Sequence, residues 1–413
     1  MKPLLVFCLV GLASHAHAAE LAPVHPAGLP STELAQAWLQ QDPGVQEAAG
    51  GIEAAEHSAG ILRVSPYEWN LGYGSQKRRF TTGPDSDEWT ARLERTVRLP
   101  GKRALDRSLA TAEGELAQAV YGEAIHEAAR DLVELYTQWA RAVRASELMA
   151  EQVKFTSENL RAVRLRQRAG DASTLEVNAV EADTAQVLGS LSEAVSTQRK
   201  TLAKLQIRFP GADAQALELA DPQTISEAEQ VWKNRILSTS DPLKIAQVRL
   251  EQAELAASRA RADRLPDPTV AIHSASESYS NEKIIGVTVT VPLPGRLRSH
   301  QLGRALGLVE IARAARDRQQ RIIEFEVAEA YADATGNFER WQLAEKSAAS
   351  TGESARLSQR AYSLGEADLQ TLLLARRQAV EAADSALDAR ATALTSYYRL
   401  LVDAHLVWGL EHD

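Results

Sequence analysis

Two long stretches of the chain carry the apolar spacing of a helix. Apolar side chains recur every three or four positions, as at Leu132, Tyr136 and Trp139, which is the spacing of one helix face. The pattern runs without proline over residues 102–168 and again over residues 296–363. A helix of roughly 67 residues is ~100 Å long, because each residue adds 1.5 Å. Rods of this length predict a protein in which helices pack side by side.

Four shorter segments alternate apolar and polar residues, which is typical of strands with two different faces. Two lie at about residues 65–99 and two at about residues 268–293. One face carries polar residues such as Arg92, Glu94 and Arg98, and the other carries apolar and aromatic residues that suit lipid. The predicted lipid-facing residues are Tyr67, Trp69, Leu71, Tyr73, Trp89, Leu93, Val97, Ile285, Val287, Val289 and Val291. A soluble sheet with one buried face is the alternative.

The two halves of the chain resemble each other. Leu99–Gly101 reads Leu-Pro-Gly and returns as Leu293–Gly295, and Gly170 returns as Gly365. Each half is predicted to run helix, two strands, long helix, turn and helix, so the chain is a tandem duplication. Glycine commonly follows a helix end, so the two later glycines mark the tips of two helical hairpins. The predicted units are a first repeat, a linker and a second repeat, at residues 19–209, 210–240 and 241–413.

Four strands are too few to close a barrel, because the smallest membrane barrels have about eight strands. An open sheet in lipid leaves the backbone groups of its edges without partners, at a cost of several kcal/mol each. If the strands span a membrane, three copies must combine to give a closed cylinder of about twelve strands. The predicted fold is mainly α with a small β part. It is built from a duplicated helix–strand–strand–helix unit with long helical hairpins.

The first residues resemble a secretory signal peptide. An apolar run of about ten residues, Leu4–Leu12, is shorter than a membrane span. Ala16 and Ala18 are small residues at the two positions that a signal peptidase reads. Residues 1–18 are therefore predicted to be removed, and a membrane anchor is the alternative. The single cysteine, Cys8, lies in this run, so the mature chain is expected to have no disulfide and no thiolate metal site.

Composition narrows the classes of function. The formal net charge is -9, whereas a basic stripe is the usual mark of nucleic-acid binding. After the first residues, no segment is long and apolar enough to be a membrane helix. The sequence has no P-loop, no Gly-x-Ser-x-Gly and no dinucleotide fingerprint, so we expect no enzymatic activity and no cofactor.

One motif has the spacing of a metal ligand pair. Glu123 and His126 match the Glu-x-x-His of di-iron helix bundles, but such a site needs a second copy. The equivalent of the histidine in the other half is Arg321. No pair among the remaining histidines has zinc-ligand spacing. We therefore expect no metal site and interpret His126 as a surface position on a helix.

The duplicated unit, the Leu-Pro-Gly corners and the tip Tyr362–Gly365 together resemble the TolC-type outer-membrane efflux factors. The resemblance implies a homotrimer in the outer membrane of a Gram-negative bacterium, extending into the periplasm. In such a trimer the long helical hairpins form a trimeric α-barrel joined to a 12-stranded transmembrane β-barrel, with four strands from each chain. It also implies docking to a periplasmic adaptor (membrane fusion) protein and to an inner-membrane pump of the resistance–nodulation–division type. The corner Leu99–Arg103 resembles the heavy-metal branch, the cobalt–zinc–cadmium type, which implies divalent metal cations as cargo. A duct for drugs or other organic compounds is the alternative within the family.

The resemblance also implies a gate at the periplasmic tips. In the family, a tyrosine three residues before the tip glycine bonds an acid on a neighbouring coil. Tyr362 matches the tyrosine, and Glu176 matches the acid. The family's acids at six and nine residues after the second tip glycine are Thr371 and Leu374 here, so an acidic ring in the bore is in doubt. The predicted tip residues are Tyr362, Glu176, Gly170, Asp171, Gly365, Glu366 and Asp368.

A basic cluster, Arg161–Arg168, precedes the first tip. Charged helix faces most often serve solubility, and a docking surface for an acidic adaptor is the functional alternative. A soluble periplasmic coiled-coil adaptor or scaffold is the main rival for the chain itself. An adaptor needs only one hairpin, whereas this chain has two equal halves.

Overall fold

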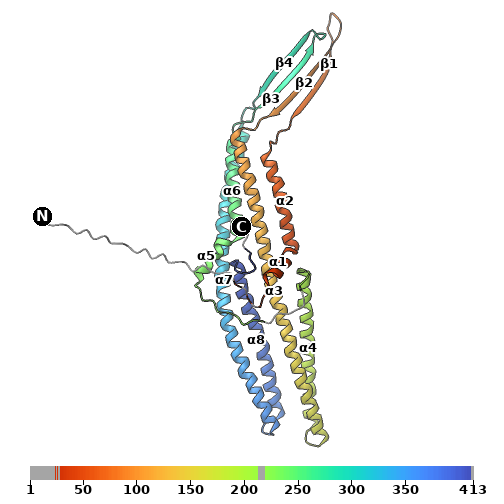
Figure 1. Cartoon of the computed structure of the whole chain (residues 1–413), viewed down its shortest axis with the longest axis vertical. Coiled ribbons are helices and arrows are strands. Elements are labelled where there is room, and N and C mark those ends of the chain that lie inside the picture. Colours follow the sequence, from red (N-terminus) through yellow and green to blue (C-terminus); the bar gives the residue numbers. More distant parts are fainter. Residues whose placement is uncertain (1–23, 25, 27, 213–218, 411–413) are drawn as a thin grey trace, which may run out of the picture.

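A computed structural model describes residues 24, 26, 28–212 and 219–410. Figure 1 shows a long, narrow molecule with the strands at one end and two helical hairpin tips at the other. The predicted signal peptide, residues 1–18, lies outside the described residues.

The described chain has two runs of elements in the same order. The first run contains α1 (Thr32–Gln40), α2 (Pro43–Arg63), β1 (Asn70–Arg78), β2 (Ser86–Thr96), α3 (Pro100–Arg168) and α4 (Thr174–Arg208). The second contains α5 (Glu229–Thr239), α6 (Asp241–Ala262), β3 (Thr269–Glu277), β4 (Glu282–Thr290), α7 (Arg296–Ser363) and α8 (Leu369–Asp403). The residues predicted as a linker, 210–240, include helix α5, because Trp232 and Ile236 bury an apolar face there.

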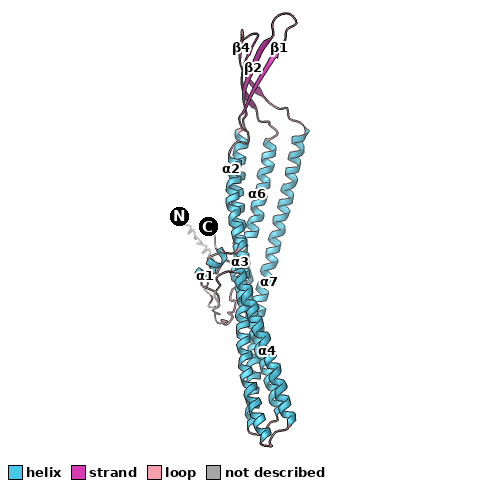
Figure 2. Cartoon of the chain, turned by 90° about the vertical axis from the view of Figure 1, so that its right-hand side faces the viewer, coloured by secondary structure: helices cyan, strands magenta, loops and turns pink. Residues whose placement is uncertain are grey.

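The two long rods are α3, with 69 residues, and α7, with 68 residues. α3 begins at Pro100, where a proline costs little because the first helical N–H has no partner within the helix. α3 packs against α4, and α7 packs against α8, so each rod forms a hairpin with its shorter partner. α3 also contacts α6 and α8, which ties the two repeats together along their length. Figure 2 shows both hairpins running down to the same end of the molecule.

The four strands form one antiparallel sheet in the order β1-β2-β3-β4. The central pair joins the repeats, since β2 of the first pairs with β3 of the second. The pairing places Leu71, Leu93, Ile272 and Val287 in one row across one face. The next row, on the other face, contains Gly72, Arg92, His273 and Gly286. β1 and β4 are the edge strands and have no neighbour on their outer side within the described residues.

The main apolar core lies in the middle of the molecule, away from the sheet and the tips. Trp38, Trp139, Trp232 and Trp408 are all buried in it. Each buried aromatic side chain stabilises the fold by roughly 1.5–3 kcal/mol. The segment after α8 folds back into this core, where the indole Nε1 of Trp408 donates to the Pro30 carbonyl oxygen at 3.0 Å. The chain's first described residues and its last are therefore held at the same level of the rods.

Candidate functional site at the helical tips and the sheet

The first hairpin tip reverses the chain within a few residues. α3 ends at Arg168, and Gly170 follows with φ +81, a left-handed conformation that costs glycine least. The Asp171 N–H then donates to the Arg166 carbonyl oxygen at 2.8 Å, which satisfies a carbonyl that the helix leaves open. Ser173 caps the start of α4. The local sequence therefore fixes the position of the turn.

The second tip repeats this construction. α7 ends at Ser363, Gly365 has φ +76, and the Glu366 N–H donates to the Ala361 carbonyl oxygen at 2.9 Å. Asp368 caps α8, because its carboxylate accepts from the Thr371 N–H at 2.7 Å. The same turn chemistry thus ends both hairpins.

Arg166 joins the two tips. Its Nη1 donates to the hydroxyl of Tyr362 at 2.8 Å, and its Nε pairs with the Asp171 carboxylate at 2.9 Å. The guanidinium carbon lies 5.7 Å from the centre of the Tyr362 ring. Hydrogen bonds to the acid and the electrostatic influence of the tyrosine raise the pKa of Arg166, so this link stays charged. One arginine therefore connects α3, its own turn and α7.

Glu176 has a different partner from the one that the resemblance implies. Its carboxylate accepts from the Ser173 N–H at 2.7 Å, and its own N–H donates to the Ser173 hydroxyl at 3.2 Å. This reciprocal pair is a capping box, and the hydrogen bonds from Ser173 lower the pKa of Glu176. Within the chain, Tyr362 bonds Arg166 and not Glu176. Sequence reasoning missed the arginine, although it lies in the basic cluster before the first tip.

A small apolar cluster holds the two hairpins together just above the tips. It contains Val163, Val177, Val180, Leu369 and Leu373, with Tyr362 packed against it. These residues come from α3, α4 and α8, so the tyrosine sits on a contact shared by both hairpins.

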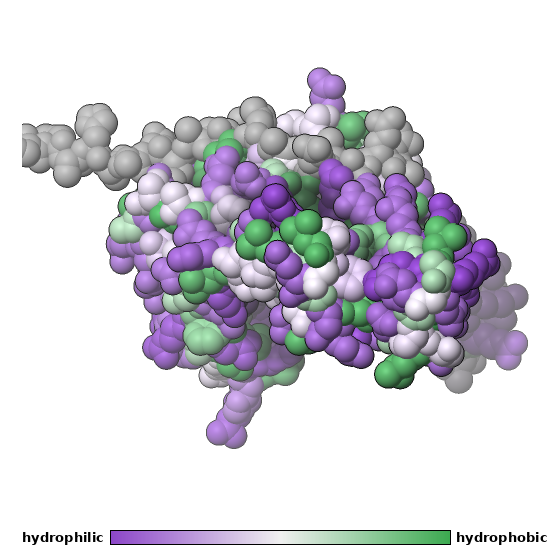
Figure 3. Space-filling view, turned by 90° about the horizontal axis from the view of Figure 1, so that it is seen from below, coloured by the Kyte–Doolittle hydropathy of each residue, from purple (hydrophilic) through white to green (hydrophobic). Residues whose placement is uncertain are grey.

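Other side chains near the second tip face outward. Thr371 is exposed, and Leu374 has 57% of its surface exposed. Seen from this end, the molecule presents a mixture of polar and apolar side chains (Figure 3). Within the described chain Leu374 is therefore uncovered, whereas its neighbours Leu372 and Leu373 are buried.

The sheet has one apolar face that is open to its surroundings. Leu71 is 79% exposed, Tyr73 is 73% exposed and Ile285 is 83% exposed. The other predicted lipid-facing residues that are exposed are Trp69, Trp89, Leu93, Val97, Val287, Val289 and Val291. Val97 and Val291 lie just beyond the ends of β2 and β4. The described chain therefore leaves large apolar side chains of a narrow sheet without cover.

Two residues at the base of this face differ from the pattern. Tyr67 precedes β1 and is half-buried, and its hydroxyl donates to the Asp267 carboxylate at 2.9 Å. Arg95 breaks the apolar series of β2, and its guanidinium lies 5.3 Å from the centre of the Trp69 ring while its Nε donates to the Tyr67 carbonyl oxygen. An arginine is tolerated here because its charge meets a ring face and a carbonyl.

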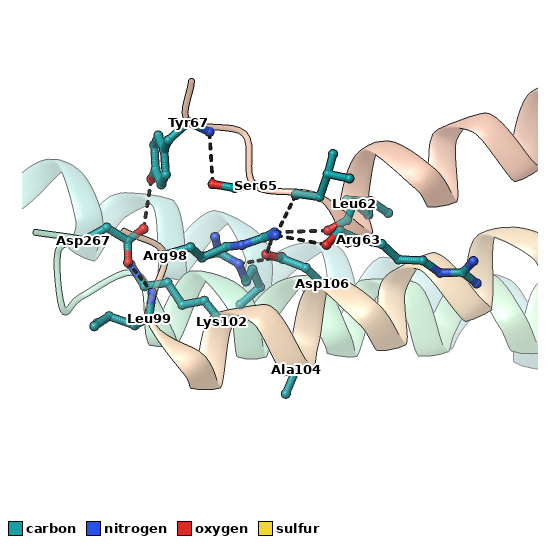
Figure 4. Close-up of polar contacts among 12 residues, drawn as sticks. Leu62, Arg63, Ser65, Tyr67, Arg98, Leu99, Lys102, Ala104, Asp106 and Asp267 are labelled. Carbon is teal, nitrogen blue, oxygen red and sulfur yellow. Dashed lines mark hydrogen bonds and ion pairs between the residues drawn. The ribbon is translucent and has the colours of Figure 1, made fainter. Parts of the chain in front are cut away.

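A network of charged side chains, most of them buried, fixes the corner where strands pass into helices (Figure 4). Lys102 is only 2% exposed, and its Nζ lies 3.0 Å from both Asp263 and Asp267. Asp267 also accepts from the Leu99 N–H at 3.1 Å. The residues of the first Leu-Pro-Gly corner are thus bound to the segment that precedes β3. This network orients the sheet on the rods.

A neighbouring acid extends this network. Asp106 of α3 pairs with Arg98 at the end of β2 and with Arg259 of α6, whose Nε lies 2.7 Å from it. Arg98 also donates to the carbonyl oxygens of Leu62 and Val64, which lie at the end of α2. The corner therefore joins the first repeat to the second at the end of the rods next to the sheet.

The expectation for His126 was wrong, because the side chain is buried and only 5% exposed. The end of α8 and the segment after it close over this part of α3, with Asp403 and His405 beside the imidazole. Within the described residues, no group of three or more histidine, cysteine, aspartate and glutamate side chains is arranged to hold a metal ion. Across the same residues, every helix falls short of the length and apolar character that a membrane crossing requires.

Residues 34–207 match the family model of the outer membrane efflux proteins. The match spans α1 to α4 and so covers the first repeat. No curated protein matches the chain in sequence.

Solved structures share the fold over nearly the full length. VceC, an outer membrane protein of Vibrio cholerae, is 17% identical with a TM-score of 0.73, over 90% of this chain and 95% of its own. The CmeC outer membrane channel of Campylobacter jejuni is 15% identical with a TM-score of 0.70, over 92% of this chain and 86% of its own. The open-state MtrE outer membrane channel of Neisseria gonorrhoeae is 18% identical with a TM-score of 0.67, over 92% of this chain and 90% of its own. The mostly helical fold with a small four-stranded sheet is therefore that of outer membrane efflux channels.

Proposed function

We propose that this chain is the outer-membrane duct of a tripartite efflux system, a passive homotrimer through which substrates leave the periplasm or a pump. The observation that carries the proposal is the open four-stranded sheet, which has an exposed apolar face and two unpaired edges. The family match of the first repeat and the fold of the whole chain support it. The proposed mature chain begins after a signal peptide that is cleaved near Ala18.

The sheet suits lipid better than water. Apolar area left in water costs roughly 25 cal/mol per Å², and the outer face carries large aliphatic and aromatic side chains. In lipid the same face is favourable, but the unpaired backbone groups of β1 and β4 then become costly. Pairing β1 of one copy with β4 of the next removes both edges. Three copies give a closed cylinder of twelve strands, with the row of Arg92 and His273 facing the lumen.

The helices also leave surfaces for neighbouring copies. α7 carries large apolar side chains that remain exposed in the single chain: Leu306, Leu308, Ile311, Ile322, Phe325 and Leu343. Exposed apolar side chains add no stability to a single copy of α7 in water. Packing them against the rods of two further copies extends the strand cylinder into a helical tunnel in the periplasm.

The tips supply a gate in this proposal. The bond between Arg166 and Tyr362 holds the two hairpins of one chain together, and an adaptor that binds the tips shifts the balance towards an open arrangement. Arg161 and Arg168 are exposed and offer positive charge to an acidic adaptor surface. The inner-membrane pump supplies the energy, so the chain itself acts as a conduit and not as an enzyme.

The finer proposal is that the cargo consists of divalent heavy-metal cations. Its support is the resemblance of Leu99–Arg103 to the heavy-metal branch. In the structure Lys102 builds the buried corner with Asp263 and Asp267, so the motif itself positions the sheet and does not touch a passing ion. Organic compounds are the competing cargo.

Envelope fractionation tests the duct. The full-length protein is expected in the outer-membrane fraction, and it should migrate as a trimer on an unheated detergent gel and as a monomer after heating. A monomer that stays in the aqueous fraction without detergent would contradict the proposal and favour a soluble periplasmic adaptor.

Growth of a deletion strain distinguishes the cargo. Sensitivity to zinc, cobalt or cadmium with unchanged resistance to organic drugs supports metal export. The reverse pattern contradicts the metal proposal and leaves the duct intact.

A further inference from the structure

A group of buried and half-buried ionisable side chains lies in the middle of the molecule and has no part in the duct or the gate. We call it the mid-body cluster. It contains Glu123, His126 and Arg130 of α3, Asp241 at the start of α6, Asp403 at the end of α8, and His405 just after α8. It therefore joins both repeats to the segment that closes the chain.

The imidazole of His126 lies between two carboxylates. Its Nε2 is 3.4 Å from the Asp403 carboxylate, and its Nδ1 is 3.6 Å from the Glu123 carboxylate. Both distances suit an ion pair but are long for a hydrogen bond, and neither ring nitrogen has a hydrogen-bond partner among the described residues. Asp403 is already bound by the Nε of Arg130 at 2.7 Å. A proton on the ring would give both carboxylates a charged partner.

Asp241 is a second candidate for proton uptake. Its carboxylate is packed so tightly against Gly122 that a Cβ at that position would come within 2.7 Å of it. A glycine in the middle of a helix costs up to about 1 kcal/mol, so the space for this carboxylate accounts for Gly122. The Oδ2 of Asp241 is buried and has no hydrogen-bond partner among the described residues. A proton would relieve this unpaired charge.

The balance of charge in the cluster favours protons. Glu123, Asp241 and Asp403 supply three carboxylates, and Arg130 is the one permanent cation inside the cluster as defined. Further charged side chains of the described chain face it from its edges: Lys244 of α6 beside Asp241, Arg399 of α8 at 4.0 Å from Asp403, and Glu326 of α7 beside Arg130. Arg235 of α5 also lies there, because its Nε donates to the Ala404 carbonyl oxygen at 3.1 Å. Arg399 is largely exposed, so solvent weakens its effect.

We propose that the mid-body cluster is a proton-operated latch, in which uptake of protons by His126 and Asp241 as the pH falls from 7.5 to 5.5 tightens the joint between α3, α6 and the segment after α8. The latch does not depend on the proposed cargo or on the gate at the tips. It makes the middle of the molecule most rigid in a mildly acidic periplasm.

The ionisation of both groups agrees with this direction. Burial alone lowers the pKa of His126, but its contacts with Asp403 and then Glu123 outweigh burial and raise the pKa above the usual value. This contribution to stability is full below the unfolded pKa and is lost as the pH rises through the folded pKa. Burial raises the pKa of Asp241 to about 6, so the folded state gains stability as the pH falls through that value. Asp403 has a lowered pKa, because His126 and Arg130 outweigh its burial, so its own titration lies below this pH range.

Hydrogen exchange of the purified full-length protein in detergent tests the latch. After correction for the intrinsic chemical rate, amides of residues 399–410 are expected to be at least about threefold more protected at pH 5.5 than at pH 7.5. Protection that is equal at the two pH values, or greater at pH 7.5, would overturn the proposal.

Three variants assign the effect. Asp241→Asn imitates the protonated acid and is expected to raise protection at pH 7.5 towards the value at pH 5.5. His126→Gln is expected to reduce the pH response, whereas His57→Gln, which changes an exposed histidine of α2, should keep the full response. If Asp241→Asn and His126→Gln both respond to pH as the parent does, the latch is wrong.

Discussion

At the scale of single residues, Arg166 and Lys102 show how one cation can organise a junction between repeats. Arg166 spans the two tips through Tyr362 and Asp171, and Lys102 holds two aspartates at the corner below the sheet. The sequence identified Tyr362 as a tip residue through its place before Gly365. It did not identify the partner, because the choice between Arg166 and Glu176 depends on how two hairpins lie beside each other. No local pattern encodes that relation.

Loss of the Arg166 side chain is expected to loosen the tips. A hydrogen bond to a charged group is worth about 1.5–3 kcal/mol, so Arg166→Gln should raise the open population by about tenfold or more. Tyr362→Phe removes only the hydroxyl and should have a smaller effect in the same direction. Conductance in a planar lipid bilayer measures both variants.

Two controls sharpen this prediction. Arg161→Gln changes an exposed arginine of the same cluster and should conduct like the parent. Glu176→Gln should also conduct like the parent, because its carboxylate caps its own helix. If Glu176→Gln conducts and Arg166→Gln stays closed, the tips are not held together by the bond between Arg166 and Tyr362.

Replacement of Lys102 is expected to destabilise the corner strongly. Lys102→Met leaves the buried Asp267 without its cation, which typically costs about 3–5 kcal/mol, whereas the partly exposed Asp263 keeps Arg259. The melting temperature of the detergent-solubilised protein should fall clearly. Arg103→Met, which changes the exposed neighbour, should leave it nearly unchanged, and equal melting temperatures for the two variants would refute the role of the corner.

At the scale of elements, most of the architecture can be predicted from the sequence. The long helices, the tip glycines and the alternation of the strands all follow from local spacing, and the structure places α3, α7 and the turns accordingly. Helix α5 was missed because it is short and lies in a stretch rich in turn residues. Its helical state depends on burying Trp232 and Ile236 against the central core, which is a tertiary effect.

Two glycines of the same region are expected to respond to alanine in opposite ways. Gly365→Ala places a side chain at φ +76, which costs about 1–2 kcal/mol for an L-residue. Gly352→Ala lies inside α7 with open space around it and should add up to about 1 kcal/mol of stability. Thermal unfolding measures both, and a Gly365→Ala variant that melts above the parent would disprove the turn's requirement for glycine.

At the scale of the whole molecule, the single chain exposes surfaces that suit contact with further copies. Its sheet has an open apolar face, its edge strands lack neighbours, and α7 exposes apolar side chains along the rod. The trimer was inferred from the sequence through the cost of strand edges in lipid. The mid-body cluster was not, because Asp241 and Asp403 lie on helices far along the chain from the Glu123–His126 motif, and no local pattern brings them together.

Adjacent residues on opposite faces of β4 test the membrane placement. Val287→Arg puts a charge on the apolar face, at a cost of about 2–4 kcal/mol near the middle of a bilayer, so the heat-resistant outer-membrane form should be depleted. Thr288→Arg puts the same charge on the polar face and should be tolerated. Equal amounts of both variants in the outer membrane would argue against a lipid-facing apolar side.

A disulfide between neighbouring copies tests the shared barrel most directly. Gly74→Cys on β1 is combined with a cysteine at Ile284 or Thr288 on β4, all on the polar face of the sheet. The control pair, Gly74→Cys with Thr90→Cys, joins directly opposed residues and should close within one chain. At least one β1–β4 pair is expected to give a covalent trimer on a denaturing gel. A control pair that closes while every β1–β4 pair stays monomeric would contradict the shared barrel.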